Sequence, residues 1–130
     1  MLSSLRILFL IVIVLALSSC KKDAGEGGTS SIKGKIYIKD FNSAGQLQAE
    51  YYATEERVYI IYGDADFYGN DTRTSFDGTY QFNYLRKGSY TIFAYQKCDT
   101  CASGVEPVKV LADINDNHST IDLADLILNK

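Results

Sequence analysis

Apolar and polar residues alternate along much of the chain after residue 30, and a period of two predicts β-strands. The clearest case is residues 32–39, where isoleucine and glycine alternate with lysine and tyrosine, so that one face is expected in the core and the other in water. Further stretches with strand character follow at 46–53, 57–62, 72–76, 79–84, 89–96, 105–111 and 120–128. With turn-forming residues between them, we expect about seven strands in total.

Two of these stretches contain residues that complicate the strand prediction. Pro107 lies within 105–111, and because proline donates no backbone hydrogen bond, that strand is expected at a sheet edge or at a bulge. In the last stretch the period of two holds at first, but residues 124–128 fit a helical turn as well as a strand. We favour a strand for this segment.

Residues 77–96 form the most distinctive part of the chain. Asp77-Gly78 is a strong turn signal, and residues 85–88 form a second, polar turn. The strand expected between these turns has one aromatic face, which carries Tyr80, Phe82 and Tyr84. The strand expected after residue 88 is apolar on both faces, which is typical of a central strand. Together the two strands predict a hairpin.

This hairpin resembles that of carboxypeptidase regulatory-like domains, which belong to the transthyretin-like group of β-sandwiches. The residues that match the recurrent pattern are Asp77, Gly78, Tyr80, Phe82, Leu85, Gly88 and Tyr90. The resemblance implies an all-β fold, a single antiparallel β-sandwich. Because the group includes carbohydrate-binding, adhesive and purely structural modules, the resemblance does not indicate one function.

The N-terminus has the pattern of an export signal. Arg6 precedes an unbroken apolar run at 7–17, which is short for a membrane-spanning helix. The sequence Leu17-Ser18-Ser19-Cys20 resembles the lipobox of bacterial lipoproteins, which implies cleavage before Cys20, a diacylglyceryl thioether on its sulfur and further acylation. The alternatives are an ordinary secretory signal with an incidental Cys20, or a signal that is retained as an anchor.

These features divide the chain into a signal peptide at 1–19, a lipidated cysteine with a flexible glycine- and serine-containing tether at 20–30, and one sandwich domain at 31–130. Arg6 is the only charged residue of the signal peptide, so its removal changes the net charge from −3 to −4. With no basic cluster, nucleic acid is not an expected partner. Lys21 follows the cysteine in place of the aspartate that retains some lipoproteins at the inner membrane, so we expect the outer membrane, on its periplasmic or outer surface.

The cysteines that remain after processing are Cys98 and Cys101. Exported proteins occupy an oxidising compartment, so we expect a structural disulfide that fixes a small loop. A thiol-redox role is the alternative, although Asp99 between the two cysteines opposes formation of a thiolate. Zinc would need two more ligands, and His118 is the only histidine of the chain.

Other candidate sites are less specific. Asp64, Asp66 and Asp71 lie in one acidic loop and are weak candidates for an oxygen-rich metal site; we expect no metal and no cofactor. The chain has ten tyrosines and no tryptophan, which is explained by sheet content or by a tyrosine-rich contact surface. The tyrosines that we expect to be available to a ligand are Tyr51, Tyr52, Tyr59 and Tyr68.

No pattern of an enzyme nucleophile, a catalytic histidine pair or a phosphate-binding loop is present in the sequence. The expected function is therefore that of a non-enzymatic envelope lipoprotein, which is held in the bilayer through acylated Cys20 and presents a β-sandwich for interaction with an envelope protein or for support. The first alternative is a carbohydrate-binding module of a glycan-uptake system. The second is a redox protein that uses Cys98 and Cys101.

Overall fold

The computed structural model describes residues 23–130, so the predicted signal peptide and Cys20 lie outside the described residues. In the described part the chain forms nine strands in two sheets. The strands are β1 (Glu26–Phe41), β2 (Leu47–Tyr52), β3 (Arg57–Tyr62), β4 (Asn70–Arg73), β5 (Thr79–Leu85), β6 (Gly88–Lys97), β7 (Val105–Ile114), β8 (Thr120–Asp122) and β9 (Leu126–Asn129). Residues 23–130 include no helix with the length and apolarity needed to cross a bilayer.

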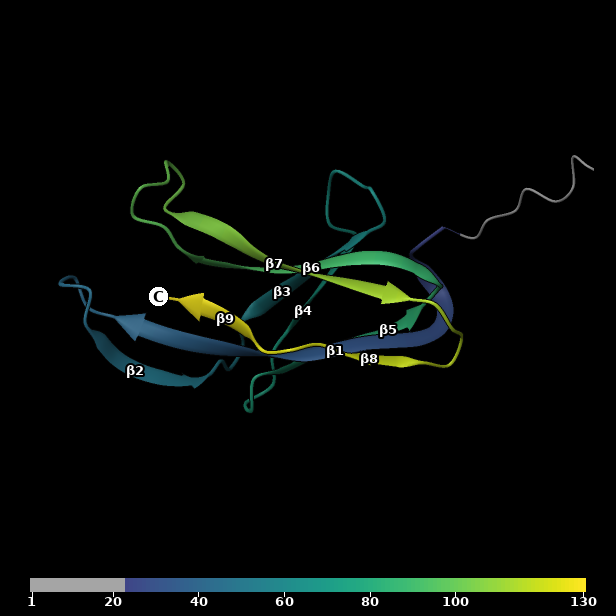
Figure 1. Cartoon of the computed structure of the whole chain (residues 1–130), viewed down its shortest axis with the longest axis horizontal. Coiled ribbons are helices and arrows are strands. Elements are labelled where there is room, and N and C mark those ends of the chain that lie inside the picture. The colour runs from purple at the N-terminus through teal and green to yellow at the C-terminus, as the bar shows by residue number, and fades with distance from the viewer. Residues whose placement is uncertain (1–22) are drawn as a thin grey trace, which may run out of the picture.

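The first sheet is built around the long strand β1 (Figure 1). Along one side β1 pairs with β5 and then with β2, both antiparallel. The two partners follow one another on this side because Ile36 donates its N–H to Gly78 and accepts the N–H of Ala53. Along the other side β1 pairs with β8 and then with β9, both parallel. The sheet is therefore mixed. The two sheets together have nine strands, two more than the predicted count of about seven.

The second sheet has the order β4-β3-β6-β7, and all of its pairs are antiparallel. Strand β7, which contains Pro107, lies at its edge, so the prediction for this proline is confirmed. The strand is longer than expected, because Ala112 and Ile114 pair with the start of β6 and are buried.

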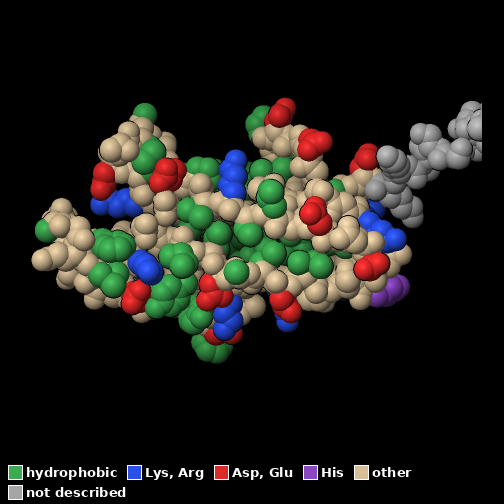
Figure 2. All heavy atoms as spheres, viewed as in Figure 1, with side chains coloured by type: hydrophobic (Ala, Val, Ile, Leu, Met, Phe, Trp, Pro, Cys, Tyr) green, Lys and Arg blue, Asp and Glu red, His purple; other side chains and the backbone are tan. Residues whose placement is uncertain are grey.

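The core lies between the two sheets, as expected for a sandwich. Inward-facing side chains alternate along the central strands, and Figure 2 shows apolar side chains along the seam between the layers. The largest buried ones are Ile32, Ile36, Val58, Ile60, Tyr80, Leu85, Tyr90, Ile92, Ile114 and Leu128. The β1–β2 ribbon extends past the second sheet in Figure 1, and every residue of β2 is exposed. The all-β sandwich prediction is confirmed.

The predicted hairpin at 77–96 is wrong in its pairing. Strand β5 pairs with β1 in the first sheet, whereas β6 pairs with β3 and β7 in the second. The turn between β5 and β6 therefore connects the two layers. Near this turn Tyr84 adopts a left-handed conformation with φ of 58°, which interrupts the alternation. As a result Tyr84 is 74 % exposed, and Leu85 occupies the core position in its place.

The ordered sheet begins earlier than the predicted domain boundary at residue 31. Strand β1 starts at Glu26, within the segment that the sequence predicts as a tether. Gly25 is also held: its N–H donates to the Tyr90 hydroxyl at 2.9 Å, and its carbonyl accepts the N–H of Arg86 at 2.9 Å. The sheet reaches this far because Leu85 and Arg86 offer backbone partners to the glycine-rich segment, which periodicity alone does not reveal.

Two other segments differ in detail from the predicted strands. Strand β4 begins at Asn70 and ends at Arg73, two residues before the expected start and three before the expected end. The strand interpretation of 120–128 is confirmed, but the segment is interrupted at residues 123–125 and forms two short strands. This interruption shapes the surface described next.

Candidate functional site

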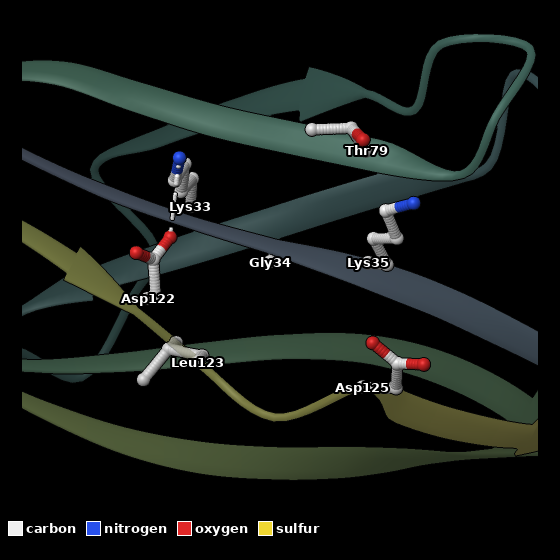
Figure 3. Close-up of a pocket in the computed structure, with 7 residues that line it drawn as sticks. All are labelled: Lys33, Gly34, Lys35, Thr79, Asp122, Leu123 and Asp125. Carbon is white, nitrogen blue, oxygen red and sulfur yellow. Dashed lines mark ion pairs between the residues drawn. The ribbon is translucent and has the colours of Figure 1, made fainter.

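A groove crosses the outer face of the first sheet at the interruption between β8 and β9 (Figure 3). Strand β8 pairs with residues 31–33 of β1 and β9 with residues 36–39, so the chain leaves β1 beside Gly34 and Lys35. The hollow has a volume of about 270 Å³. We call it the β1 groove; its lining residues are Lys33, Gly34, Lys35, Thr79, Asp122, Leu123 and Asp125.

The β1 groove carries balanced charge. Lys33 and Asp122 form an ion pair at 3.3 Å across its rim, and both side chains are largely exposed. Lys35 lies on the other side of Gly34, with its ammonium 4.8 Å from the centre of the Tyr52 ring. Asp125 accepts a hydrogen bond from the Tyr52 hydroxyl at 2.9 Å. Two lysines and two aspartates therefore surround a small hollow without a strong net field.

An aromatic pair adjoins these polar groups. Tyr37 of β1 and Tyr52 of β2 are cross-strand partners, and their rings meet edge to face with centroids 5.1 Å apart. The hydrogen bond to Asp125 and the negative charge of that carboxylate raise the pKa of Tyr52 above its usual value. Tyr52 therefore remains a neutral hydrogen-bond donor through the physiological pH range.

On the core side of the sheet, beneath the groove, Gly34 makes room for a buried tyrosine. A Cβ atom on Gly34 would lie 2.5 Å from the hydroxyl oxygen of Tyr80, its partner on β5. That hydroxyl is buried and has no hydrogen-bond partner among the described residues. Burial raises the pKa of Tyr80 to about 12, so the group is neutral. The larger side chain of β5 thus fills the space that the absence of a Cβ leaves on β1.

The outer face of the second sheet has a different character. Its centre carries the aromatic cluster Tyr59, Tyr68, Phe93 and Tyr95. The rings of Tyr59 and Phe93 stack at 4.8 Å with an interplanar angle of 12°, and the other pairs meet edge to face at 4.8 to 5.6 Å. Phe93 is only 6 % exposed because its neighbours cover it. No tyrosine hydroxyl of this cluster bonds to another described residue.

The four tyrosines expected at a ligand surface do not come together. Tyr51 and Tyr52 lie on β2 in the first sheet, whereas Tyr59 and Tyr68 belong to the aromatic cluster on the second. Tyr51 is also separated from Tyr52, because neighbouring residues of a strand point to opposite faces. Sequence reasoning missed Lys35, Asp125 and Tyr37, and no local signal marks them, since their proximity comes from a parallel pairing between distant segments.

The three carboxylates of the acidic loop do not form a cluster of potential metal ligands. Asp71 lies on β4 and pairs with Arg57 at 3.5 Å, while Asp64 and Asp66 are exposed in the preceding loop. Among residues 23–130, the one group of potential metal ligands that lie close together is Cys98, Cys101 and Glu106. Its two sulfurs are joined to each other and therefore offer no thiolate. His118 is not part of this group.

The predicted bond between Cys98 and Cys101 is confirmed; it closes the loop between β6 and β7. The backbone supports the same loop, because Cys101 donates its N–H to the carbonyl of Cys98, and Cys98 donates to Gly104. A structural role for the disulfide and a redox role both stay predictions.

No protein-family model matches the chain, and no curated protein matches its sequence. A solved structure from Pseudomonas aeruginosa, described as a "putative carbohydrate binding protein", is similar with a TM-score of 0.51 and 15% identity. The match covers 82% of this chain and 92% of that one. At this identity the likeness establishes a shared sandwich fold over most of both chains.

Proposed function

We propose that this chain is a non-enzymatic lipoprotein of the bacterial cell envelope whose β-sandwich binds a carbohydrate. The lipobox at Leu17–Cys20 supports the anchor, and we place the protein in the outer membrane. The solved structure with the same fold is described as a "putative carbohydrate binding protein", which supports the ligand class. The sequence patterns expected of an enzyme are absent, which supports a binding role.

The observation that carries the ligand class is the combination of polar and aromatic groups at the β1 groove. Sugars present hydroxyls that bond to carboxylates and ammonium groups, and C–H faces that pack on aromatic rings. Asp122 and Asp125 supply acceptors, Lys33 supplies a donor, and the Tyr37–Tyr52 pair lies alongside. Because the charges of the groove balance, a neutral sugar fits better than an acidic or basic one.

The size of the hollow limits what it holds. Its volume of about 270 Å³ lies just below the usual range for small-molecule sites, which begins at about 300 Å³. We therefore infer that the groove takes one sugar ring, either a monosaccharide or one unit of a longer glycan. Figure 3 shows the residues that line the groove on both sides of Gly34.

The ligand is tested by screening the purified lipoprotein in detergent on a glycan array and titrating the retained sugars by calorimetry. Asp125→Asn and Tyr52→Phe are expected to weaken binding by about tenfold each, which corresponds to ~1.4 kcal/mol. Tyr95→Phe, on the second sheet, is the matched control and should leave the affinity unchanged. If no glycan is retained, or if Tyr95→Phe weakens binding equally, the proposed site is wrong.

The anchor is tested separately by intact-mass measurement of the protein from bacterial membranes. We expect the mass of a chain that begins at Cys20 and carries acyl groups. Cys20→Ala, or inhibition of the lipoprotein signal peptidase with globomycin, should leave the uncleaved precursor. Normal processing under either condition would exclude lipidation at Cys20.

A further inference from the structure

A second hollow lies at the end of the sandwich where the chain enters the first sheet. Its volume is about 500 Å³, and its lining residues are Gly27, Gly28, Thr29, Arg86, Lys87, Asn117 and His118. Figure 2 shows basic side chains and the histidine, with acidic side chains beside them, at the end of the domain near the N-terminal residues drawn in grey. We call this surface the basic hollow.

The lining of the basic hollow favours an anion. Arg86 and Lys87 contribute positive charge, and none of the described residues that line it carries a carboxylate. The Nε atom of Arg86 is buried without a hydrogen-bond partner among the described residues. The nearest acidic residue along β1, Glu26, is engaged elsewhere, because it accepts hydrogen bonds from Tyr62 and Asn70. Asp116, next to the lining residue Asn117, bonds to Ser30 only through its backbone carbonyl, and its side chain is exposed outside the lining.

The glycines of β1 allow a ligand to approach the backbone closely. Gly27 has a φ of 102°, which other residues rarely adopt, and no atom lies within 4 Å of the place that its Cβ would occupy. Gly28 packs directly on the carbonyl of Leu85, where a Cβ would lie at 2.0 Å. At Gly27 and Gly28 the lining is therefore main chain without side chains, which leaves room for a bulky tetrahedral group such as a phosphate.

The distance to the predicted anchor is short. Gly25 is fixed by its hydrogen bonds to Tyr90 and Arg86, so the domain holds the chain firmly from that residue. Five residue steps separate Gly25 from Cys20. A fully extended chain covers about 3.5 Å per residue, so the firmly held part of the domain begins within about 18 Å of Cys20. A tether that extended to residue 30 would have allowed the domain to stand far from the membrane.

We propose that the basic hollow rests on the bilayer and binds the phosphate of an anionic lipid headgroup. The inference depends on the lipidation of Cys20 in the proposed function. The short reach brings this end of the domain to the headgroup layer, and its positive charge complements the lipid. The opposite end, with the turn between β1 and β2, then points away from the membrane (Figure 1).

The test uses the absence of tryptophan from the chain, which makes a single introduced tryptophan an unambiguous reporter. Asn115→Trp places it in the exposed loop between β7 and β8, beside the basic hollow, and Ser43→Trp places it in the exposed turn between β1 and β2. The acylated protein is reconstituted in phosphatidylcholine vesicles, with or without phosphatidylglycerol, that contain a lipid with a nitroxide on its headgroup. We expect fluorescence quenching at residue 115, stronger with phosphatidylglycerol, and none at residue 43.

A charge reversal identifies the phosphate contact. Lys87→Glu in the Asn115→Trp chain should abolish the additional quenching caused by phosphatidylglycerol. Lys109→Glu makes the same charge change at an exposed position of β7, and it should leave the additional quenching by phosphatidylglycerol unchanged. Equal quenching at residues 43 and 115, or equal effects of the two reversals, would overturn the docking proposal while leaving the anchor in place. A mass without acyl groups would instead remove the anchor and the docking with it.

Discussion

The outer faces of the two sheets both carry tyrosines, but they use them differently. On the first sheet, Tyr52 bonds to Asp125 and lies under the ammonium of Lys35, beside a hollow. On the second sheet, the rings of Tyr59 and Phe93 stack on each other with their centroids 4.8 Å apart. One surface combines aromatic and polar groups around a hollow, whereas on the other the aromatic rings pack on one another.

This difference shows that an exposed tyrosine is weak grounds for a ligand site. Aromatic residues on a sheet surface stabilise the sheet when they pair across strands. A binding surface needs polar groups that lie near an aromatic ring and can still form hydrogen bonds with a ligand. Four predictions test whether one face serves binding and the other serves stability. They are given in order of decreasing expected effect.

The largest effect should come from the aromatic cluster. Phe93→Ala removes a ring that is 6 % exposed, and we expect the free energy of unfolding to fall by about 3 kcal/mol. Tyr52→Ala, on the exposed ribbon, should cost less than about 1 kcal/mol. Chemical denaturation measures both changes, and glycan titration should show the opposite order. If Tyr52→Ala destabilises the protein as much as Phe93→Ala, the contrast between the faces is lost.

The second prediction concerns Gly34 and the buried tyrosine beneath the β1 groove. Gly34→Ala forces a methyl group onto the Tyr80 hydroxyl, and we expect a loss of about 2 kcal/mol. Tyr80→Phe removes a buried hydroxyl without a partner, so alone it should stabilise the protein by about 1 kcal/mol. In the Gly34→Ala background the gain should be larger, because the clash is also relieved. Equal gains in both backgrounds, measured by thermal unfolding, would contradict this packing.

The third prediction concerns the link between the sheets at the basic end. The Tyr90 hydroxyl of β6 accepts the N–H of Gly25 and donates to the carbonyl of Arg86 at 2.6 Å. Tyr90→Phe should lower stability by about 1 kcal/mol and speed amide exchange at residues 25 and 26. Exchange at β9, on the far part of the first sheet, is the internal control. Unchanged exchange at residue 25 would show that this link does not hold the start of β1.

The smallest effect concerns the turn that leads from β4 to β5 and so joins the sheets. Hydrogen bonds from the Ser75 hydroxyl and the Thr79 backbone lower the pKa of Asp77 to about 2. A carboxyl whose pKa is lower in the folded chain stabilises it fully above the ordinary value of 3.8, and this contribution is lost as the pH falls through about 2. Asp77→Asn should therefore destabilise slightly at neutral pH and not below pH 2. A difference that persists at the lowest pH would contradict this origin.

Strand positions could be predicted because burial on one face imposes a local pattern. The range of β3 agrees with the expected segment. Strand β5 ends one residue later than expected, and β6 is one residue longer than expected at each end. Pro107 also indicated an edge correctly, since the lost N–H has a purely local consequence. These predictions were correct because each depends only on the side chains of the segment itself.

Partners could not be predicted from the same pattern. The alternation of apolar and polar residues shows which side chains of a strand face the core, but not whether consecutive strands share a sheet. For this reason the two strands of segment 77–96 were wrongly expected to pair as a hairpin. The β1 groove has the same difficulty, because Lys35 and Asp125 are ninety residues apart and meet only through the pairing of β1 with β9. The start of β1 was wrongly predicted to be a tether, because its glycine and serine residues are also typical of flexible tethers.

The central position of β1 has a consequence for how the molecule is made. The ladder on one side of this strand is completed only by residues 120–129, the last part of the described chain. A chain that is made from its N-terminus therefore presents an unpaired edge along β1 until residues 120–129 have been added. Such dependence on contacts between distant segments slows folding. We expect the first sheet to be completed late in folding for this reason.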